Sequence, residues 1–396
     1  MRSFAVVLVG VAKGTITTMS CDPSTNGFST RSDYVRSTLI VGLALFCGAG
    51  MLTSQTAWAR AKSHAALAAA KVVVEPNGTV HVPGQTVPVS SYLSPQAKAY
   101  VAQHLIQMQE PRLLVQVKGV PVFMEPFLRR DHELFAVSRK EEAIGGVGVY
   151  AYTPASGVTA RNRNRVLINL HGGGFSGCWP GCAELESIPI AALMRVKVIT
   201  VNYREGPKYK FPAASEDVAS VYAALLKTYK PDAIGIYGCS AGGALTAMSV
   251  AWFDKHHLPE PGAIGIYCAS AGGFGGDSSY FALPIGESRM PSPHSMERTD
   301  LSYFSNVSMQ APMVSPVDYP QILAKFPPTL ILTGTRDFAL SGALYTHEQL
   351  VKAGVDAELH VWEGLFHGFF YNADVPESRD AFRVMIRFFD RHLGTD

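Results

Sequence analysis

Short apolar runs alternate with longer amphipathic segments along the chain from about residue 134 onward. The short runs are rich in β-branched residues, which predicts strands, whereas apolar positions that recur every three or four residues predict helices. The predicted strands are Leu134–Arg139, Val147–Thr153, Arg165–Leu170, Val196–Val201, Ala233–Tyr237, Ala263–Cys268, Thr329–Leu332 and Asp356–Val361. The predicted helices among them are Ala214–Tyr229, Gly242–Lys255, Ser341–Ala353 and Glu377–Leu393.

This alternation predicts an α/β fold with a mostly parallel central sheet and helices on both faces. Upstream, Val72–Val82 holds Asn77-Gly78 between two β-branched runs, which is typical of a hairpin. Ser94-Pro95 opens a predicted helix over Gln96–Gln109. Residues 274–327 interrupt the alternation and are rich in Gly, Ser, Pro and Met. We expect this insertion to cover the carboxyl edge of the sheet, where open α/β folds bind ligands.

The N-terminal residues have the pattern of an export signal. Arginines at 31 and 36 precede an uncharged apolar run, Leu39–Leu52, which is followed by Ala57-Trp58-Ala59, an A-x-A cleavage site. The run is shorter than the roughly 20 residues of a spanning helix, so we expect cleavage after Ala59 and no stable membrane insertion afterwards. The expected location is secreted or periplasmic. We also expect translation to begin near Val35, which N-terminal sequencing of the unprocessed product would test.

Composition and charge favour an ordinary globular protein over a nucleic-acid-binding one. The chain has 396 residues, a formal net charge of +2 and 47% hydrophobic residues. No long block of Lys and Arg provides an electrostatic footprint for nucleic acid. The densest basic run lies at 161–165, between Gly157 and a predicted strand, and we interpret it as a solvated loop.

Four cysteines follow the predicted cleavage site. Cys178 and Cys182 flank a short Trp-Pro-Gly loop, so they can form a disulfide, which export permits, or remain two free thiols. Cys239 and Cys268 end predicted core strands, and we expect them to be buried thiols. No His or Cys partner has the spacing of a zinc site, so no metal is expected.

Two nearly identical segments each present a serine at a predicted strand end. Residues 233–243 are AIGIYGCSAGG and residues 263–273 are AIGIYCASAGG. Gly238, Ser240 and Gly242 complete G-x-S-x-G, the pattern of a nucleophilic serine on a sharp strand-to-helix turn. At Ser270 a cysteine replaces the first glycine, and we expect the following Gly-rich segment to be stopped early by Pro284. Ser240 is therefore the candidate nucleophile, at the N-terminus of a helix that favours developing negative charge.

A glycine-rich loop follows the strand predicted at Arg165–Leu170. Its sequence is HGGGF at 171–175, and consecutive glycines allow the backbone to turn its N–H groups toward a ligand. With the N–H of Ala241, this loop would donate hydrogen bonds to the oxyanion of an acyl-transfer intermediate. The alternative, a flexible loop without such a role, is disfavoured by its pairing with the serine motif.

An acid and a base follow Ser240 in the order that such hydrolases require. Asp337 comes just after the strand Thr329–Leu332, and His367 just after Asp356–Val361, so both belong to the carboxyl edge that carries Ser240. His367 would take the Ser240 proton, and Asp337 would fix its tautomer and stabilise the imidazolium. The competing side chains, judged less suitable by their positions, are His347, His360, Glu363 and Asp318.

These motifs resemble the hormone-sensitive-lipase family of α/β hydrolases, in its bacterial esterase branch. The blocks that carry the resemblance are HGGGF at 171–175, NYREGPKYKFPAASEDV at 202–218, GCSAGG at 238–243, PPTLILTGTRDF at 327–338 and FHGFF at 366–370. The resemblance covers about residue 134 to the end and implies the α/β-hydrolase fold. The chain departs from the family pattern at Cys239, Lys208 and Ser341, where the family has acidic residues.

The resemblance also implies roles for individual residues. It implies a catalytic triad of Ser240, Asp337 and His367. The implied oxyanion donors are the N–H groups of Gly173, Gly174 and Ala241, in a loop shaped by His171 and Gly172. The implied domains are an N-terminal extension with its signal at 1–59, a lid segment at 60–133 and a catalytic domain at 134–396. The 274–327 insertion completes the lid.

The implied activity is that of a serine carboxylic-ester hydrolase. It would act through an acyl-enzyme intermediate on small-molecule esters of short to medium acyl length, or on lactones, and it needs no cofactor. The alternatives are a serine peptidase or amidase and a catalytically silent binding protein on the same fold, since a fold alone does not fix function. A homodimer is an open alternative to a monomer.

Overall fold

The computed structural model describes residues 86–291 and 302–394, Gly84, and four short strands nearer the N-terminus. The chain splits into two compact units, which are Met1–Gln85 and Thr86–Asp396. The predicted signal peptide, its cleavage site after Ala59 and the proposed start near Val35 lie outside the described residues. No helix within the described ranges combines the length and apolar character needed to cross a membrane.

The first unit contains two small antiparallel hairpins. One pairs β1 (Val11–Ala12) with β2 (Thr15–Ile16), and the other pairs β3 (Val73–Val74) with β4 (Val80–His81). The pairing of β3 with β4 confirms the hairpin predicted within residues 72–82.

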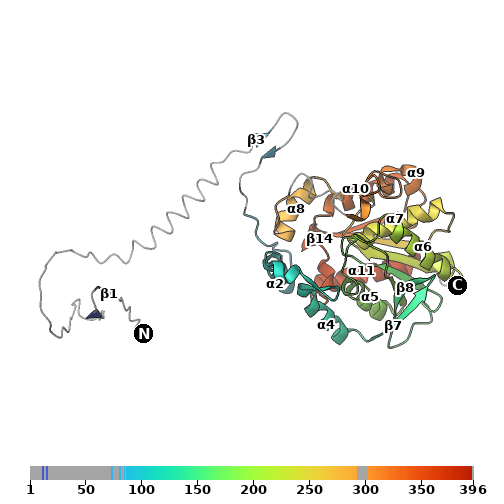
Figure 1. The fold of residues 1–396 in the computed structure, drawn as a ribbon, viewed down its shortest axis with the longest axis horizontal. Coiled ribbons are helices and arrows are strands. Elements are labelled where there is room, and N and C mark those ends of the chain that lie inside the picture. The colour runs from blue at the N-terminus through green and yellow to red at the C-terminus, as the bar shows by residue number, and fades with distance from the viewer. Residues whose placement is uncertain are drawn as a thin grey trace, which may run out of the picture. The chain divides into compact units, whose positions relative to one another are not determined.

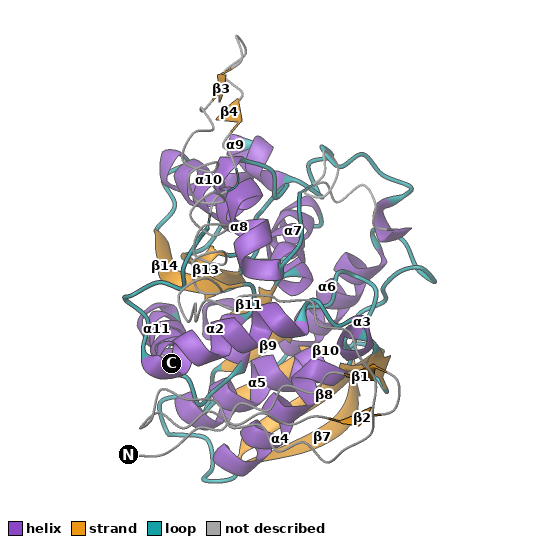
Figure 2. Cartoon of the chain, turned by 90° about the vertical axis from the view of Figure 1, so that its left-hand side faces the viewer, coloured by secondary structure: helices purple, strands orange, loops and turns teal. Residues whose placement is uncertain are grey.

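The second unit is built on an eight-stranded sheet, shown in orange in Figure 2 from β14 to β7. Its order is β14-β13-β12-β11-β9-β10-β8-β7. Only the pairs β7/β8 and β8/β10 are antiparallel, which confirms the mostly parallel sheet. The strands are β7 (Val137–Ile144), β8 (Val147–Pro154), β9 (Val166–Leu170), β10 (Lys197–Val201), β11 (Ile234–Cys239), β12 (Ala263–Tyr267), β13 (Thr329–Arg336) and β14 (Ala357–Phe366).

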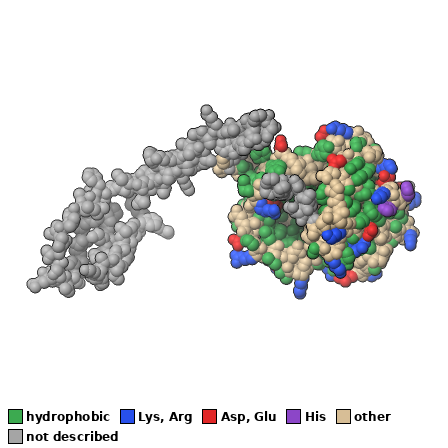
Figure 3. Space-filling view, turned by 45° about the horizontal axis from the view of Figure 1, so that its top comes forward, with side chains coloured by type: hydrophobic (Ala, Val, Ile, Leu, Met, Phe, Trp, Pro, Cys, Tyr) green, Lys and Arg blue, Asp and Glu red, His purple; other side chains and the backbone are tan. Residues whose placement is uncertain are grey.

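Helices cover both faces of this sheet, as Figure 1 shows. One face packs against α6 (Ala213–Leu225), α7 (Ala241–Lys255) and α10 (Leu340–Lys352), and the other against α5 (Gly181–Met194) and α11 (Pro376–His392). A buried apolar cluster fills each interface. On the face seen in Figure 3, acidic and basic side chains are scattered, without a continuous patch of either sign.

The remaining elements lie before the sheet and between β12 and β13. Before the sheet come α2 (Pro95–Gln107), α3 (Pro111–Leu114), β5 (Gln116–Val117), β6 (Val120–Pro121), η1 (Val122–Met124) and α4 (Glu125–Leu134). The 274–327 insertion contains α8 (Asp277–Glu287), η4 (Ser302–Phe304), η5 (Pro316–Asp318) and α9 (Pro320–Leu323). The short turns η2 (Pro231–Ala233) and η6 (Phe369–Tyr371) lie elsewhere in the second unit, before β11 and after β14.

The structure corrects the predicted start of the first strand and the predicted effect of Pro284, and it adds one helix that the sequence pattern did not predict. The first strand begins at Val137 instead of Leu134, because the residues before it close α4. Pro284 does not stop the segment after Ser270: it lies inside α8, which continues to Glu287 with buried neighbours on its inner face. The pattern also failed to predict α5, because its residues are buried almost all round and Pro189 interrupts it, so no amphipathic period is visible.

The basic run at 161–165 is not simply a solvated loop. Arg165 is buried, and its Nε donates to the Gly394 carbonyl oxygen at 2.8 Å while Nη2 donates to that of Leu393. Its Nη1 lies 3.2 Å from the Asp390 carboxylate and 3.3 Å from the Asn162 amide oxygen. The side chain therefore satisfies the last carbonyls after α11 and attaches that helix to the start of β9.

Replacing Arg165 with alanine should destabilise the second unit. We expect Arg165→Ala to lower the free energy of unfolding by roughly 2–3 kcal/mol, because buried carbonyls lose their charged donor. Arg163, in the same run, is exposed and provides the matched control: Arg163→Ala should change it by under about 0.5 kcal/mol. Urea unfolding followed by circular dichroism measures both, and equal stability of the two variants would contradict this role.

Candidate active site

Ser240 occupies a strained turn between β11 and α7. Its backbone angles are φ 57° and ψ −121°, a region that non-glycine residues rarely adopt outside functional sites. The Ser240 N–H donates to the Tyr267 carbonyl oxygen at 2.8 Å, which ties the turn to the neighbouring strand β12. Ser240 is partly exposed, whereas Cys239 and Ala241 on either side are buried. The turn therefore presents the serine hydroxyl while it buries its neighbours.

Glycines allow this turn to press against the end of β9. A Cβ atom on Gly238 would lie 2.2 Å from the Leu170 carbonyl oxygen, and one on Gly242 only 1.7 Å from the same atom. Neither position can hold a side chain without moving backbone. The serine turn thus contacts the residue that directly precedes the HGGGF loop.

The HGGGF loop is held in a conformation that requires glycine. Gly173 has φ 119°, and a Cβ atom there would lie 1.9 Å from the Gly177 carbonyl oxygen. Gly174 follows with φ 65°. Within the described part of the chain, the N–H groups of Gly173, Gly174 and Ala241 have no protein acceptor. These are the three groups that the sequence predicts as oxyanion donors, and they remain free to bind a ligand.

His171 is buried at the start of this loop and packs against it. Its ring stacks on Tyr203 at 4.3 Å between centroids, and its Nδ1 lies 2.7 Å from the Gly172 carbonyl oxygen. The Tyr203 hydroxyl donates to the His171 carbonyl oxygen at 2.7 Å. Burial lowers the pKa of His171 to about 4, although the hydrogen bond to Gly172 opposes this effect. The imidazole is therefore neutral near pH 7 and suited to shape the loop.

Asp337 and His367 form a buried acid–base pair. The Asp337 Oδ1 and His367 Nδ1 atoms are 2.8 Å apart, and Asp337 is fully buried. The Asp337 carboxylate also accepts hydrogen bonds from the Thr333 hydroxyl and the Ala339 N–H, both at 2.8 Å. Burial raises the pKa of Asp337, but the charge and hydrogen bond of His367 outweigh it and hold the pKa below its usual value. Asp337 is thus ionised and oriented toward the imidazole.

The environment of His367 makes it a strong base. Burial lowers its pKa, but the charge and hydrogen bond of Asp337 outweigh this effect and raise the pKa to about 9. The ring stacks on Phe338 at 4.1 Å, which fixes its plane. With Nδ1 bonded to Asp337, the other nitrogen is the one available for proton transfer.

Cys268 links this pair to the serine turn. Its thiol accepts a hydrogen bond from the Gly368 N–H at 3.3 Å, and its sulfur lies within 4.8 Å of the ligand atoms of Asp337 and His367. Cys268 directly follows Tyr267, and Tyr267 pairs with Cys239 in the sheet. Asp337 and His367 therefore border the turn that carries Ser240. Burial raises the pKa of the Cys268 thiol, and His367 Nδ1 is engaged by Asp337. This cluster therefore suits proton transfer better than metal binding.

Ser270, the second candidate, has a structural place. It is buried, and its Oγ lies 2.6 Å from the Gly272 carbonyl oxygen and 3.1 Å from the Gly272 N–H. These bonds close the loop after β12. Ser270 thus serves its own turn, whereas Ser240 occupies the strained and partly exposed one.

Cys178 and Cys182 form a disulfide beside the glycine loop, with Cα atoms 5.4 Å apart. The sequence left open whether they pair. Cys239 and Cys268 are free and buried, as predicted. A Cβ atom on Gly173 would lie 2.8 Å from the Cys178 Cβ, so the disulfide packs directly against the loop.

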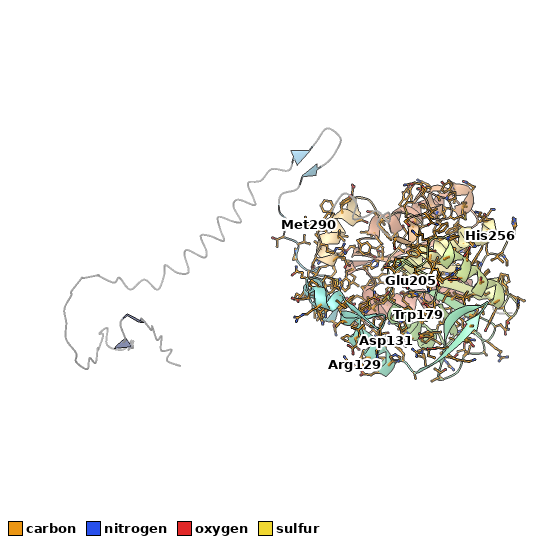
Figure 4. All side chains as sticks on the ribbon, viewed as in Figure 1. Arg129, Asp131, Trp179, Glu205, His256 and Met290 are labelled. Carbon is orange, nitrogen blue, oxygen red and sulfur yellow. A yellow bond between two sulfur atoms is a disulfide. The ribbon has the colours of Figure 1, made fainter. Side chains whose placement is uncertain are left out.

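Two acidic residues beside the site were not predicted from the sequence. Glu205, labelled in Figure 4, accepts a hydrogen bond from the Gly177 N–H at 3.0 Å, in the loop that follows the HGGGF segment. Burial raises the pKa of Glu205 to about 7, against the lowering effect of that bond. Glu186 lies on α5 beneath the loop and is buried. The one signal for Glu186 in the sequence is its spacing, since it lies four residues after Cys182 and four before Ile190, as expected for one side of a helix.

Comparisons with known proteins agree with this geometry. A family model described as the alpha/beta hydrolase fold matches residues 167–371. An acetyl-hydrolase of Streptomyces hygroscopicus is 26% identical over 262 residues, which cover 63% of this chain and 86% of the relative. The carboxylesterase/phospholipase LipF of Mycobacterium tuberculosis is 29% identical over 245 residues. This match covers 59% of the chain and 64% of LipF, just under two thirds of that relative's length.

Solved structures give the same result. The crystal structure of esterase E25 is 28% identical, with a TM-score of 0.68, and the match covers 79% of this chain and 99% of that one. An esterase from the bacterial hormone-sensitive lipase family aligns with a TM-score of 0.62 over 75% of this chain, at 22% identity, which shows a shared fold.

The pair of Asp337 and His367 makes a prediction that needs no substrate. In an NMR pH titration, the His367 ring should titrate near pH 9, because its charged form is stabilised by Asp337. In Asp337→Asn, burial remains while the opposing charge is lost, so the His367 pKa should fall below about 6.5. The pKa of His360, which burial and the charge of Arg387 lower, does not depend on Asp337 and should be the same in both proteins. A His367 pKa unchanged by the substitution would contradict the pairing.

Proposed function

We propose that this chain, which belongs to the α/β-hydrolase fold family, is an ester hydrolase of the hormone-sensitive-lipase type with Ser240, Asp337 and His367 as its catalytic triad. The observation that carries the proposal is the buried His367–Asp337 hydrogen bond beside the strained turn of Ser240. Each residue alone has a structural alternative, but together they supply a nucleophile, a base and an orienting acid.

The reaction proceeds in two acyl transfers. His367 removes the Ser240 proton as Oγ attacks the ester carbonyl, and the resulting oxyanion accepts hydrogen bonds from the N–H groups of Gly173, Gly174 and Ala241. The carbon–oxygen bond to the alcohol breaks, and the alcohol leaves with the proton from His367, so that Ser240 is acylated. Water then attacks the acyl-enzyme with His367 as base, and the acid is released.

We propose esters of short to medium acyl length, with lactones as the nearest alternative. An apolar wall lies beside the base, because Phe338 stacks on His367 and Phe274 meets Phe338 edge-on at 5.8 Å. Such rings suit an acyl chain or a small apolar alcohol better than a charged substrate. Hydrolysis of these esters would give the protein a role in lipid metabolism.

We propose that α2 and α8 form the lid over this site. The two helices come from the N-terminal segment and the insertion, and they are joined where the Ser288 hydroxyl donates to the Leu105 carbonyl oxygen at 2.8 Å. His104 and Glu287 lie 3.7 Å apart at the same junction. We also propose export through the N-terminal signal, which the disulfide supports because such bonds persist in oxidising compartments.

Loss of the Ser240 hydroxyl should abolish turnover without unfolding the protein. We expect Ser240→Ala to lower kcat for p-nitrophenyl butyrate by at least about 10⁴-fold, since the substitution removes the Oγ atom that accepts the acyl group. The control Ser270→Ala should keep activity within about threefold. A panel of acyl lengths, lactones and aminoacyl amides then separates the ester hydrolase from an amidase. Turnover by Ser240→Ala at the normal rate would refute the assignment.

The rate should rise with pH below the pKa of His367. Only the neutral imidazole can take the Ser240 proton, and the neutral fraction grows tenfold per pH unit up to about 9. We therefore expect kcat/KM to rise about tenfold between pH 7 and pH 8 and to level off near pH 9, in buffers corrected for spontaneous hydrolysis. A rate independent of pH between 6 and 8.5 would contradict His367 as the base.

A further inference from the structure

Glu186 is a buried carboxylate on a helix of the second unit. It lies on α5 with 2% of its surface exposed, among apolar residues of that helix and of the sheet. Within the described residues it makes no ion pair, so no counter-ion balances its charge. Burying a carboxylate in this way costs several kcal/mol unless hydrogen bonds replace its lost hydration. The fold must therefore provide those bonds.

Four donors surround the Glu186 carboxylate. Oε1 accepts from the Gly172 N–H and the Tyr371 hydroxyl, both at 2.9 Å. Oε2 accepts from the Asn169 side-chain amide at 2.9 Å and from the Cys239 N–H at 3.2 Å. Burial raises the pKa of Glu186 to about 7, and these four hydrogen bonds act against the rise. Three of these partners, the Gly172 and Cys239 N–H groups and the Asn169 amide nitrogen, can only donate, and they favour the ionised carboxylate.

Three of these donors belong to the segments that carry the reaction. Gly172 directly precedes Gly173 and Gly174, the proposed oxyanion donors. Cys239 directly precedes Ser240. Tyr371 lies four residues after His367, on the turn η6 that closes the histidine loop. One carboxylate therefore holds one backbone or side-chain group on each of the three segments.

The helix that carries Glu186 is itself anchored. The Tyr237 hydroxyl, from β11, donates to the Glu186 carbonyl oxygen at 2.9 Å. The disulfide between Cys178 and Cys182 connects the first turn of α5 to the loop that follows the oxyanion segment. The carboxylate thus sits on a rigid element, which is where a group that sets geometry must lie.

We propose that Glu186 is a positioning residue that sets the geometry of the oxyanion hole by holding the Gly172, Cys239 and Tyr371 segments in register. The proposal rests on the proposed function, because it takes Ser240 and its oxyanion donors as the reacting groups. Glu186 touches no substrate and acts through the three segments. A shift of about 1 Å in such a site costs on the order of 100-fold in rate.

The test compares two buried glutamates of the same helix. Glu186→Gln keeps the shape but turns one acceptor oxygen into an NH₂ group that faces N–H or O–H donors. The control is Glu184→Gln, whose carboxylate binds Arg139 and His132. We expect Glu186→Gln to lower kcat for p-nitrophenyl butyrate about 10- to 100-fold with KM within about threefold. Glu184→Gln should keep kcat within about twofold.

A transition-state analogue separates positioning from general stability. A trifluoromethyl ketone adds to the nucleophilic serine and places an oxyanion in the hole, whereas the matching methyl ketone binds as a ground-state analogue. In Glu186→Gln, the Ki of the trifluoromethyl ketone should rise by the same factor by which kcat/KM falls. The Ki of the methyl ketone should change by less than about twofold. A merely structural role would move neither Ki in this selective way.

The outcomes are distinct. Folded Glu186→Gln with kcat within twofold of the parent, or an equal loss in Glu184→Gln, overturns the role of Glu186. If Glu186→Gln does not fold, the test uses Tyr371→Phe, which removes one donor and keeps the carboxylate. In this variant kcat should fall about threefold or more, with a matching rise in the Ki of the trifluoromethyl ketone. An unchanged kcat and Ki in Tyr371→Phe would overturn the proposal. An active Ser240→Ala refutes the proposed function instead, whereas an inactive Ser240→Ala beside an unaffected Glu186→Gln refutes only the positioning role.

Discussion

The close approach of two backbones at the carboxyl edge of the sheet governs the rest of the site. The turn after β11 presses so tightly on the end of β9 that neither Gly238 nor Gly242 has room for a Cβ atom beside the Leu170 carbonyl oxygen. This contact places the strained Ser240 next to the HGGGF loop. Packing on both faces of the sheet stabilises the contact and offsets the cost of the strained backbone, on the order of 1–3 kcal/mol.

Two buried carboxylates support the segments around that contact, and the fold stabilises each in a different way. Asp337 has His367 as a charged partner, supported by two hydrogen bonds, and its pKa stays low. Glu186 has only dipolar donors, and burial keeps its pKa near 7. The first arrangement prepares a proton acceptor. The second gives a fixed acceptor around which neutral backbone groups are arranged, which is the kind of preorganisation that low-dielectric sites reward.

How well the sequence predicted each element depended on how local its cause is. Short-range pattern predicted several elements that the structure contains. They are the parallel strands β9 and β11, the helix capped by Ser94 and the hairpin of β3 and β4. The helix α5 escaped because burial on all sides removes its periodicity. The extension of β7 through exposed charged residues escaped because an edge strand is held by backbone pairing, which side-chain pattern does not report. The prediction that Pro284 ends its segment was wrong because α8 continues through the proline, stabilised by tertiary packing on both sides of it.

The sequence by itself determined the chemical inventory: a serine between glycines, a glycine loop, and an acid and a histidine in the right order at strand ends. These are local motifs, and the parallel topology brings strand ends to one edge whatever the details. Only the tertiary structure decided that Asp337 and not Glu363 or Asp318 meets His367, that Ser270 closes its own loop, and that Cys178 and Cys182 are joined. Only the tertiary structure showed that Arg165 and Glu186 are buried and hydrogen-bonded to several segments. The stability of a buried charge depends on donors and acceptors that lie far away in the chain.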